Sequence, residues 1–178
     1  MKETLDSEDR LAHLLQNKES KMFLLVLDKD PLKSAQLVPD KLKFKQLIEL
    51  CQLICSAGIS DIYKPIKQGK ALQEWVKKHP EYIAIYMWSL KDYCKNNVRL
   101  KYKTVFDIEQ IYFDLYYLCK DRVKMIKEPT TTAIFRYSKD YNGFTKHPTN
   151  TELPIDECIK EYKKYIEWKM LNGVRGYV

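Results

Sequence analysis

Residues 40–57 repeat apolar side chains at the spacing of an α-helix, and this periodicity constrains the fold more than any other feature of the sequence. At about 100° per residue, the polar side chains fall within an arc of about 80° opposite the apolar face. Gly58 is a typical residue to end such a helix. The apolar face consists of Phe44, Leu47, Ile48, Leu50, Cys51, Ile54 and Cys55, and the polar arc of Lys41, Lys45, Glu49, Gln52 and Ser56.

The same spacing predicts further helices over residues 105–127 and 155–171. A short helix is expected over residues 70–78, and residues 81–96, which are apolar nearly all round, are expected to form a helix through the core. Residues 23–27 are consecutively apolar and are stopped by Asp28-Lys29-Asp30-Pro31, which indicates a short buried strand or extended segment. Residues 130–154 lack periodicity and predict a loop with a binding or lid role. We therefore expect a mainly α fold, a compact single-domain helical bundle with a short N-terminal strand or extended segment.

The domain organisation follows from a change of composition at Met22. Residues 1–21 are mostly polar and are interpreted as an N-terminal arm, and residues 22–178 as a single helical domain. A hydrophobic content of 45% in 178 residues suffices for one core. No apolar run approaches the roughly 20 residues that cross a bilayer. The 5 cysteines form no C-x-x-C pair and lie in apolar stretches, which favours buried thiols and an intracellular location.

The charge balance is basic, with 31 Lys and Arg against 24 Asp and Glu and a formal net charge of +7. Such a balance favours an anionic partner such as nucleic acid. Most of the positive charge is lysine, which binds phosphate as a mobile point charge, so contacts to the nucleic-acid backbone are expected rather than base readout. The bias of an AT-rich genome towards lysine explains the composition equally well.

Several common kinds of site are not indicated by the sequence. Cysteine and histidine do not recur at metal-ligand spacing, and no G-x-G-x-x-G, P-loop or G-x-S-x-G motif occurs. We therefore expect no metal and no cofactor, and neither a common nucleotide kinase, nor a dehydrogenase, nor a serine hydrolase.

The polar stripe of the 40–57 helix is the first candidate site. Lys45 precedes Glu49 by one helical turn, and Lys41 precedes Lys45 by another. A carboxylate among lysines can move a proton or stabilise a cationic sugar, and a lysine amine can attack a sugar carbon. The competing interpretation is a solvated helix face with ordinary ion pairs one turn apart.

Two further surfaces could bind nucleic acid. One is aromatic and basic, and it continues to Arg175 and Tyr177; exposed rings there could stack on bases, unless the rings are core residues of an amphipathic helix. The other lies at two X-Pro turns, where loop architecture alone is the competing explanation. The residues concerned are Tyr162, Lys163, Tyr165 and Trp168 in the first surface, and Lys64 and His79 in the second.

Several motifs together resemble a known group of proteins. The motifs are, in order, Val26-Leu27-Asp28-Lys29-Asp30-Pro31, Ser34-Ala35-Gln36, and Asp40-Lys41 with Lys45 and Glu49 in the helix that follows. This series resembles small phage and bacterial proteins that have a V-L-D-x-D-P-x-x-A-A-Q pattern followed by C-D-K-H-x-x-K-x-x-x-E. The likeness extends through Tyr63-Lys64-Pro65 and His79-Pro80 to the tyrosine, lysine and tryptophan helix near the end.

That group is distantly similar to the phage pyrimidine-dimer DNA glycosylases of the endonuclease V type, which are compact helical enzymes with an N-terminal amine nucleophile and a helical glutamate. The resemblance implies a DNA glycosylase or abasic-site lyase acting on damaged or modified bases, located in a host cytoplasm or associated with a virus. It assigns Glu49 as the catalytic carboxylate with Lys45 beside it. It also implies phosphate contacts by Lys41, Lys43 and Lys45, and it likens Tyr162 and Tyr165 to the aromatic C-terminal segment of that family.

Three differences from the pattern keep an alternative open. The histidine of D-K-H is Leu42, the preceding cysteine is Pro39, and the chain begins ahead of the family start at Met22. These changes suit a catalytically inactive viral protein that serves virion assembly, regulation or interference with host defence through a protein partner. A small-nucleotide pocket between the 40–57 helix and the 130–154 loop is a third possibility.

Overall fold

The structure is a computed structural model that describes residues 23–123 and 130–177. The predicted N-terminal arm, residues 1–21, lies outside the described residues, as do residues 124–127 of the helix predicted over 105–127. The mainly helical prediction is confirmed. The helices are α2 (Pro31–Leu37), α3 (Asp40–Ser56), α4 (Lys70–Lys78), α5 (Pro80–Asn97), α6 (Tyr102–Val123) and α7 (Ile155–Leu171), and the strands are β1 (Thr132–Phe135) and β2 (Thr151–Pro154).

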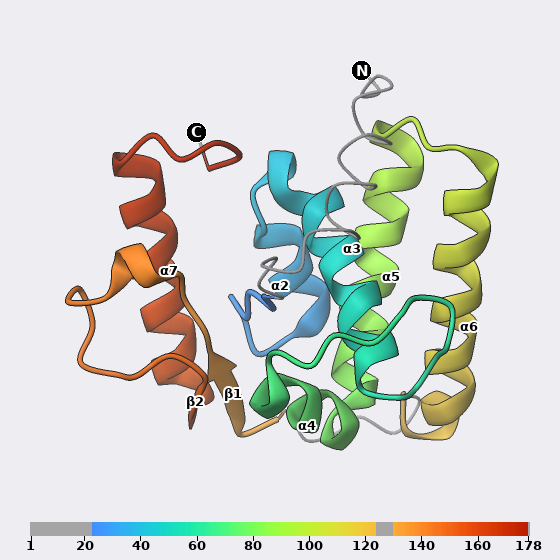
Figure 1. The fold of residues 1–178 in the computed structure, drawn as a ribbon, viewed down its shortest axis with the longest axis horizontal. Coiled ribbons are helices and arrows are strands. Elements are labelled where there is room, and N and C mark those ends of the chain that lie inside the picture. Colours follow the sequence, from blue (N-terminus) through green and yellow to red (C-terminus); the bar gives the residue numbers. More distant parts are fainter. Residues whose placement is uncertain (1–22, 124–129, 178) are drawn as a thin grey trace.

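Helix α5 lies at the centre of a bundle in which it contacts α2, α3 and α6 (Figure 1). Its apolar residues point in several directions because helices cover it on several sides, which explains why 81–96 shows no single apolar stripe. Ile83, Met87 and Leu90 of α5 are buried, as are Leu50 and Leu53 of α3. The same core contains the five cysteines, all of which are buried free thiols.

Helix α7 stands on the other side of the molecule from α6, and a two-stranded hairpin connects it with the bundle (Figure 1). Helix α7 packs on β1 and β2, and α4 contacts β1. The indole Nε1 of Trp75 in α4 donates a hydrogen bond of 3.0 Å to the carbonyl of Thr132 in β1. The hairpin thereby ties the C-terminal helix to the bundle.

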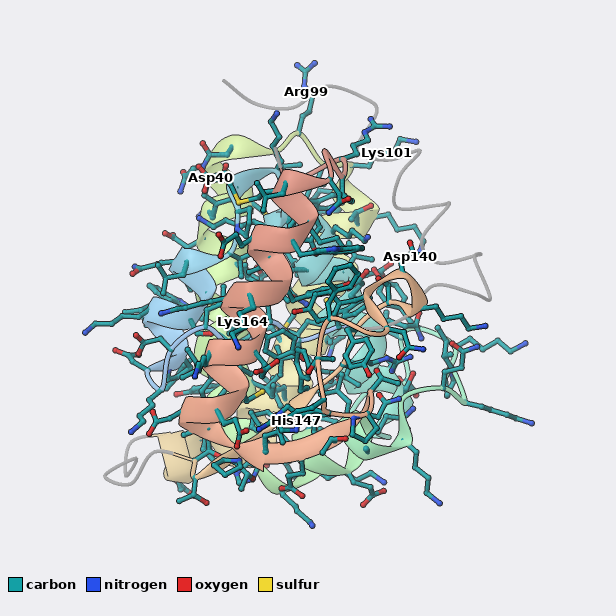
Figure 2. All side chains as sticks on the ribbon, turned by 90° about the vertical axis from the view of Figure 1, so that its left-hand side faces the viewer. Asp40, Arg99, Lys101, Asp140, His147 and Lys164 are labelled. Atoms are coloured by element: carbon teal, nitrogen blue, oxygen red, sulfur yellow. The ribbon has the colours of Figure 1, made fainter. Side chains whose placement is uncertain are left out.

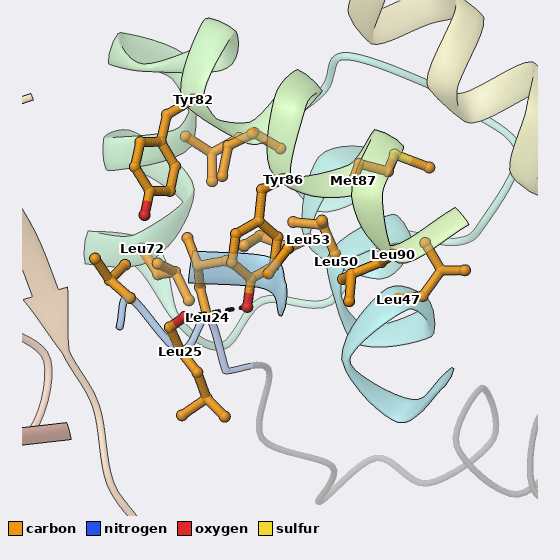
Figure 3. Close-up of a cluster of buried hydrophobic side chains, with 14 of the residues drawn as sticks. Leu24, Leu25, Leu47, Leu50, Leu53, Leu72, Tyr82, Tyr86, Met87 and Leu90 are labelled. Atoms are coloured by element: carbon orange, nitrogen blue, oxygen red, sulfur yellow. Dashed lines mark hydrogen bonds between the residues drawn. The ribbon is translucent and has the colours of Figure 1, made fainter. Parts of the chain in front are cut away.

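Residues 23–27 form a buried extended segment and pair with no strand among the described residues. Side chains take the place of a neighbouring strand. Gln46 of α3 accepts from the amide of Leu25 at 3.1 Å and donates to the carbonyl of Phe23 at 2.6 Å. The hydroxyl of Tyr86 donates to the carbonyl of Leu25 over 3.0 Å (Figure 3). Of the two predicted forms, the extended segment is therefore the observed one.

Residues 130–154 contain regular structure that the sequence analysis did not predict. Strands β1 and β2 pair antiparallel, with Thr132 opposite Pro154 and Phe135 opposite Thr151. The prediction of an uninterrupted loop is wrong because four-residue strands are too short to show a period, and β1 is buried over three consecutive residues. The connection between the strands keeps irregular structure around a short 3₁₀ turn, Lys139–Tyr141.

The C-terminal tail returns from α7 to the start of α3. Gly176 has a φ of +93°, and a Cβ built on it would lie 2.5 Å from Cδ2 of Leu42. Only glycine fits both this conformation and this contact. The tail therefore closes over the N-terminal end of α3. None of the described helices is long and apolar enough to cross a membrane.

Candidate functional site

A cleft of about 720 Å³ opens between the bundle and the α7 side of the molecule. One wall consists of α3 and the extended segment, and the other of α7, the C-terminal tail and the 3₁₀ turn. Figure 2 views the α7 side and shows Asp140 of the 3₁₀ turn beside that helix. The lining residues are Phe23, Leu25, Leu42, Lys45, Gln46, Glu49, Gln68, Ser138, Lys139, Asp140, Tyr165, Lys169, Val174, Arg175 and Tyr177.

Glu49 supplies a carboxylate to this cleft from the middle of α3. Its side chain is 6% exposed, and the amide of Phe23 donates to its Oε2 over 3.3 Å. Burial raises the pKa of Glu49 to about 7, against smaller lowering effects from Lys45, the Phe23 amide and Arg136. A carboxyl group with this pKa exists in both protonation states near neutral pH, which suits an acid or base in proton transfer.

Lys45 is the amine closest to this carboxylate along α3. Its Nζ lies 3.8 Å from Oε1 of Glu49, and its side chain is 48% exposed while that of Glu49 is 6% exposed. The pair is therefore asymmetric: a carboxylate on the cleft floor and an ammonium that reaches solvent. This arrangement differs from the solvated ion pair considered in the sequence analysis, since one partner is buried and both line a cavity.

The cleft as a whole is positively charged. Lys45, Lys139, Lys169 and Arg175 line it against the two carboxylates Glu49 and Asp140. The charges come from three separate parts of the chain, so the basic character arises from folding and not from one cationic run. A concave surface of this kind attracts anions such as phosphates.

Aromatic rings form part of the lining. The rings of Phe23 and Tyr165 stack with their centroids 6.4 Å apart. Nζ of Lys169 lies 5.2 Å from the centroid of Tyr165 and 5.9 Å from that of Tyr177. The hydroxyl of Tyr165 donates to Oγ of Ser138 at 3.1 Å, which holds the 3₁₀ turn against α7. The cleft thus combines rings with cations, a pairing suited to nucleotide ligands.

Arg136 supplies a buried cation near the floor of the cleft. Its side chain is 5% exposed, and Nη1 has no hydrogen-bond partner among the described residues. Burial lowers the pKa of this guanidinium, while the charge of Glu49 acts in the opposite direction. The positive field of Arg136 favours the ionised form of Glu49.

The structure brings together several of the predicted site residues. Glu49 and Lys45, the two predicted catalytic residues, both line the cleft, and so does Tyr165 from the predicted aromatic surface. Lys169, Arg175 and Tyr177, which extend that surface along the sequence, line it as well. The two surfaces that looked separate in the sequence therefore face the same cavity.

Tyr162 lies in the core, so its ring is not available for stacking on a base. Its side chain is fully buried. Its hydroxyl donates a hydrogen bond to the carbonyl of Ile134 at 2.7 Å and accepts one from the amide of Arg136 at 3.0 Å. Trp168 packs against Tyr141 and Phe144 outside the cleft lining, and Lys163 is an exposed residue on α7 that also lies outside it.

The other predicted nucleic-acid contacts also lie outside the cleft lining. Lys43 points towards α5: its Nζ lies 2.7 Å from Asp40 and 4.5 Å above the ring of Tyr93. Two positions along a helix turn a side chain by about 200°, so Lys43 lies on the other side of α3 from Lys45. Lys41 and Lys64 are exposed, and the imidazole of His79 packs on Trp75 with ring centroids 4.8 Å apart.

Several lining residues were not singled out from the sequence, among them Phe23, Ser138 and Lys139. Phe23 belongs to the apolar run that predicted a buried segment, and nothing in the sequence distinguishes its partly exposed ring from Leu24 or Leu25. Ser138 and Lys139 lie between the strands of the unpredicted hairpin. The prediction that residues 130–154 take part in binding was the only signal for them.

Comparison of the chain with models of protein families, with curated proteins and with solved structures found no match. Among the described residues, no group of three or more His, Cys, Asp or Glu side chains could hold a metal ion.

Proposed function

We propose that the cleft binds the phosphate backbone of DNA and that Glu49 transfers protons in a reaction of the DNA glycosylase and abasic-site lyase type. The observation that carries this proposal is the position of Glu49, a buried carboxyl group with a pKa of about 7 on the floor of a cleft lined by four cationic residues. The residues that resemble the phage glycosylases support the same assignment.

The amine of the proposed reaction is Lys45. Its proton passes to the Glu49 carboxylate 3.8 Å away, and the free electron pair of Nζ forms a bond to C1′ of the ring-opened abasic sugar. The π pair of the carbonyl moves to its oxygen, which takes up the proton that the attacking nitrogen gives up. Glu49 then protonates the resulting hydroxyl group, which leaves as water as the nitrogen pair forms the C=N bond. The product is an imine between Lys45 and the sugar.

Strand cleavage follows from this imine by elimination. Removal of a proton from C2′ forms a C1′–C2′ double bond while the iminium nitrogen takes up the π pair of the C=N bond, which gives an enamine. The nitrogen pair then re-forms the C=N bond, the C1′–C2′ pair shifts into the C2′–C3′ bond, and the C3′–O bond breaks with release of the phosphate. Water then hydrolyses the imine and frees Lys45. Glu49 alternates between acid and base in these steps, which a pKa near neutrality permits.

The rings of the cleft support recognition of a base outside the duplex. A flipped nucleotide needs a flat apolar surface for its base and cations for its phosphates. Phe23 and Tyr177 provide partly exposed rings, and the buried ring of Tyr165 stacks with that of Phe23. Lys139, Lys169 and Arg175 provide the charges. Damaged or unpaired bases cost less to extrude, so such a cleft selects for them without base-edge readout.

The test is covalent trapping. We expect the full chain, incubated with a duplex containing an abasic site and with borohydride as the hydride donor, to form a reduced adduct. Glu49→Gln should slow adduct formation by about 100-fold, within the range for loss of a general acid or base, and Lys45→Met should abolish it. Lys33→Met, an exposed lysine of α2, is the matched control. Absence of adduct and of strand cleavage with the unaltered chain would refute the enzyme.

A second candidate is supported by the position of the cleft. It lies between α3 and the 130–154 region, where a small-nucleotide pocket was considered, because Ser138, Lys139 and Asp140 line it. A free nucleotide that binds there should raise the melting temperature of the protein in proportion to the logarithm of its concentration. Stabilisation by nucleotides without any trapped adduct would favour this binding function over the lyase.

A further inference from the structure

A row of exposed aromatic residues runs along α6. Tyr102 is 87% exposed, Phe106 59%, Phe113 58% and Tyr117 64%. The rings of Phe113 and Tyr117 stack with their centroids 6.0 Å apart. We call these four residues the aromatic row. Isolated exposed apolar residues are ordinary, but four large rings in one line are not.

The aromatic row lies on the side of α6 that faces away from the bundle. At 100° per residue its four members fall within an arc of about 60°, opposite the buried side of the helix. The buried side is formed by Ile108, Ile111, Leu115 and Cys119. Helix α6 lies at the outer edge of the molecule (Figure 1), so a second body can reach the row without displacing another described helix.

The spacing of the aromatic row is the same in both directions along the helix. It reads Tyr, three residues, Phe, six residues, Phe, three residues, Tyr, with its midpoint between Glu109 and Gln110. A two-fold axis through that midpoint places Phe106 of one antiparallel copy opposite Phe113 of the other, and Tyr102 opposite Tyr117. Two-fold interfaces require this reciprocity, in which residue i contacts j and j contacts i.

The residues at the midpoint have their polar groups occupied within one copy. Oε2 of Glu109 lies 3.0 Å from Nζ of Lys91, and Nε2 of Gln110 donates to Asp114 over 3.1 Å. Two copies of α6 can therefore approach at the midpoint without facing bare carboxylates. The surface available is also sufficient: at about 150–250 Å² per aromatic side chain, the exposed parts of the four rings offer roughly 500 Å² per copy. Flanking residues would bring the total near the roughly 1,200 Å² at which stable interfaces begin.

We infer that the occupant of this face is a second copy of the chain, and that the protein forms a two-fold dimer through antiparallel pairing of α6. This inference is independent of the proposed activity. Helix α7, which forms one wall of the cleft, stands on the other side of the molecule from α6 (Figure 1), so pairing through α6 leaves that wall uncovered.

The first test is the molecular mass of the full chain in solution by sedimentation velocity, over about 1 to 100 μM, where an interface of this size should associate. We expect a dimer at the upper end and a monomer for Phe113→Glu. Leu118→Glu is the matched control, since Leu118 lies on the same helix with the same exposure, 58%, but outside the aromatic row. A monomer at every concentration, with the row left to another kind of partner, would overturn the inference, as would a dimer that Phe113→Glu leaves intact.

The second test measures the register. Phe106→Cys and Phe113→Cys chains should form a disulfide-linked pair when mixed under mild oxidation, and each variant alone should not. The five natural cysteines are buried and should not compete. Linkage of each variant to itself would indicate parallel pairing and contradict the proposed arrangement, and so would the absence of any linkage in the mixture.

Discussion

The backbone amide of Phe23 donates to Oε2 of Glu49 across 3.3 Å, although the two residues are 26 positions apart in the chain. This contact places the extended segment over the middle of α3 and covers the carboxyl group. Burial of the carboxyl group is the largest cause of its raised pKa. The segment thus sets the acidity of the residue to which we assign proton transfer.

The titration of Glu49 should respond to its cationic neighbours. We expect a pKa of about 7 in the unaltered chain and a higher value in Lys45→Met, because the charge of Lys45 stabilises the ionised carboxylate. Arg136→Met should change it in the same direction by a smaller amount. Carbon-13 NMR of labelled glutamate side chains measures both. An unshifted Glu49 resonance titrating near 4.5, the ordinary value, would contradict the buried position.

The same shift predicts a dependence of stability on pH. The folded pKa of Glu49 is raised from 4.5 to about 7, so the folded state holds this proton more tightly than the unfolded chain. Its contribution to stability is complete below pH 4.5 and is lost as pH rises through about 7. Glu49→Gln should remove this loss of unfolding free energy, which is on the order of 3 kcal/mol. Urea unfolding of both chains between pH 4 and pH 9 checks it, and parallel curves would count against the shift.

The basic wall of the cleft should determine the salt dependence of binding. Lys169→Gln combined with Arg175→Gln should weaken binding to single-stranded or abasic DNA and lower the slope of log K against log salt by about one for each cation removed. Lys160→Gln, an exposed lysine of α7 outside the cleft lining, is the matched control. Fluorescence anisotropy at several salt concentrations provides the slopes. Equal slopes for the double variant and the control would show that DNA binds elsewhere.

Tyr162 and the cleft should be separable by mutation. Tyr162→Phe leaves the amide of Arg136 and the carbonyl of Ile134 without their buried partner, so we expect a loss of about 1–3 kcal/mol in the free energy of unfolding. DNA affinity below the melting temperature should stay unchanged, since Tyr162 does not line the cleft. Tyr116→Phe, on an exposed ring outside the aromatic row, should change neither quantity. A Tyr162→Phe chain of full stability that no longer binds DNA would reverse the assignment.

Local periodicity predicted the helices well. The 155–171 helix agrees with α7 at both ends, and the helix predicted over residues 40–57 ends within one residue of α3. Such agreement is expected where an apolar face repeats over several turns. The hairpin escaped prediction because its strands have four residues each and because β1 is buried over consecutive residues instead of alternate ones.

The candidate site was predictable only on one wall. The spacing of Lys45 and Glu49 showed that both lie on one side of α3, and the structure places both in the cleft. Spacing could not show how the two neighbouring tyrosines of α7 are placed. Both are buried, but the hydroxyl of Tyr162 bonds to β1, whereas the ring of Tyr165 stacks with Phe23 beside the cavity. The burial of Glu49 was also unpredictable, because the segment that covers it is distant in sequence.

The hydrogen bonds that hold residues 23–27 fix the position of this segment along the bundle. A strand in a sheet can slip along its neighbour because identical backbone groups recur at every second residue. Here the amides of Leu25 and Leu27 donate hydrogen bonds to the side chains of Gln46 and Ser34, respectively. No equivalent acceptor among the described residues would meet these amides if the segment moved by one or two residues. The segment accordingly docks in one register only, and the ring that it presents to the cavity belongs to Phe23 and to no adjacent residue.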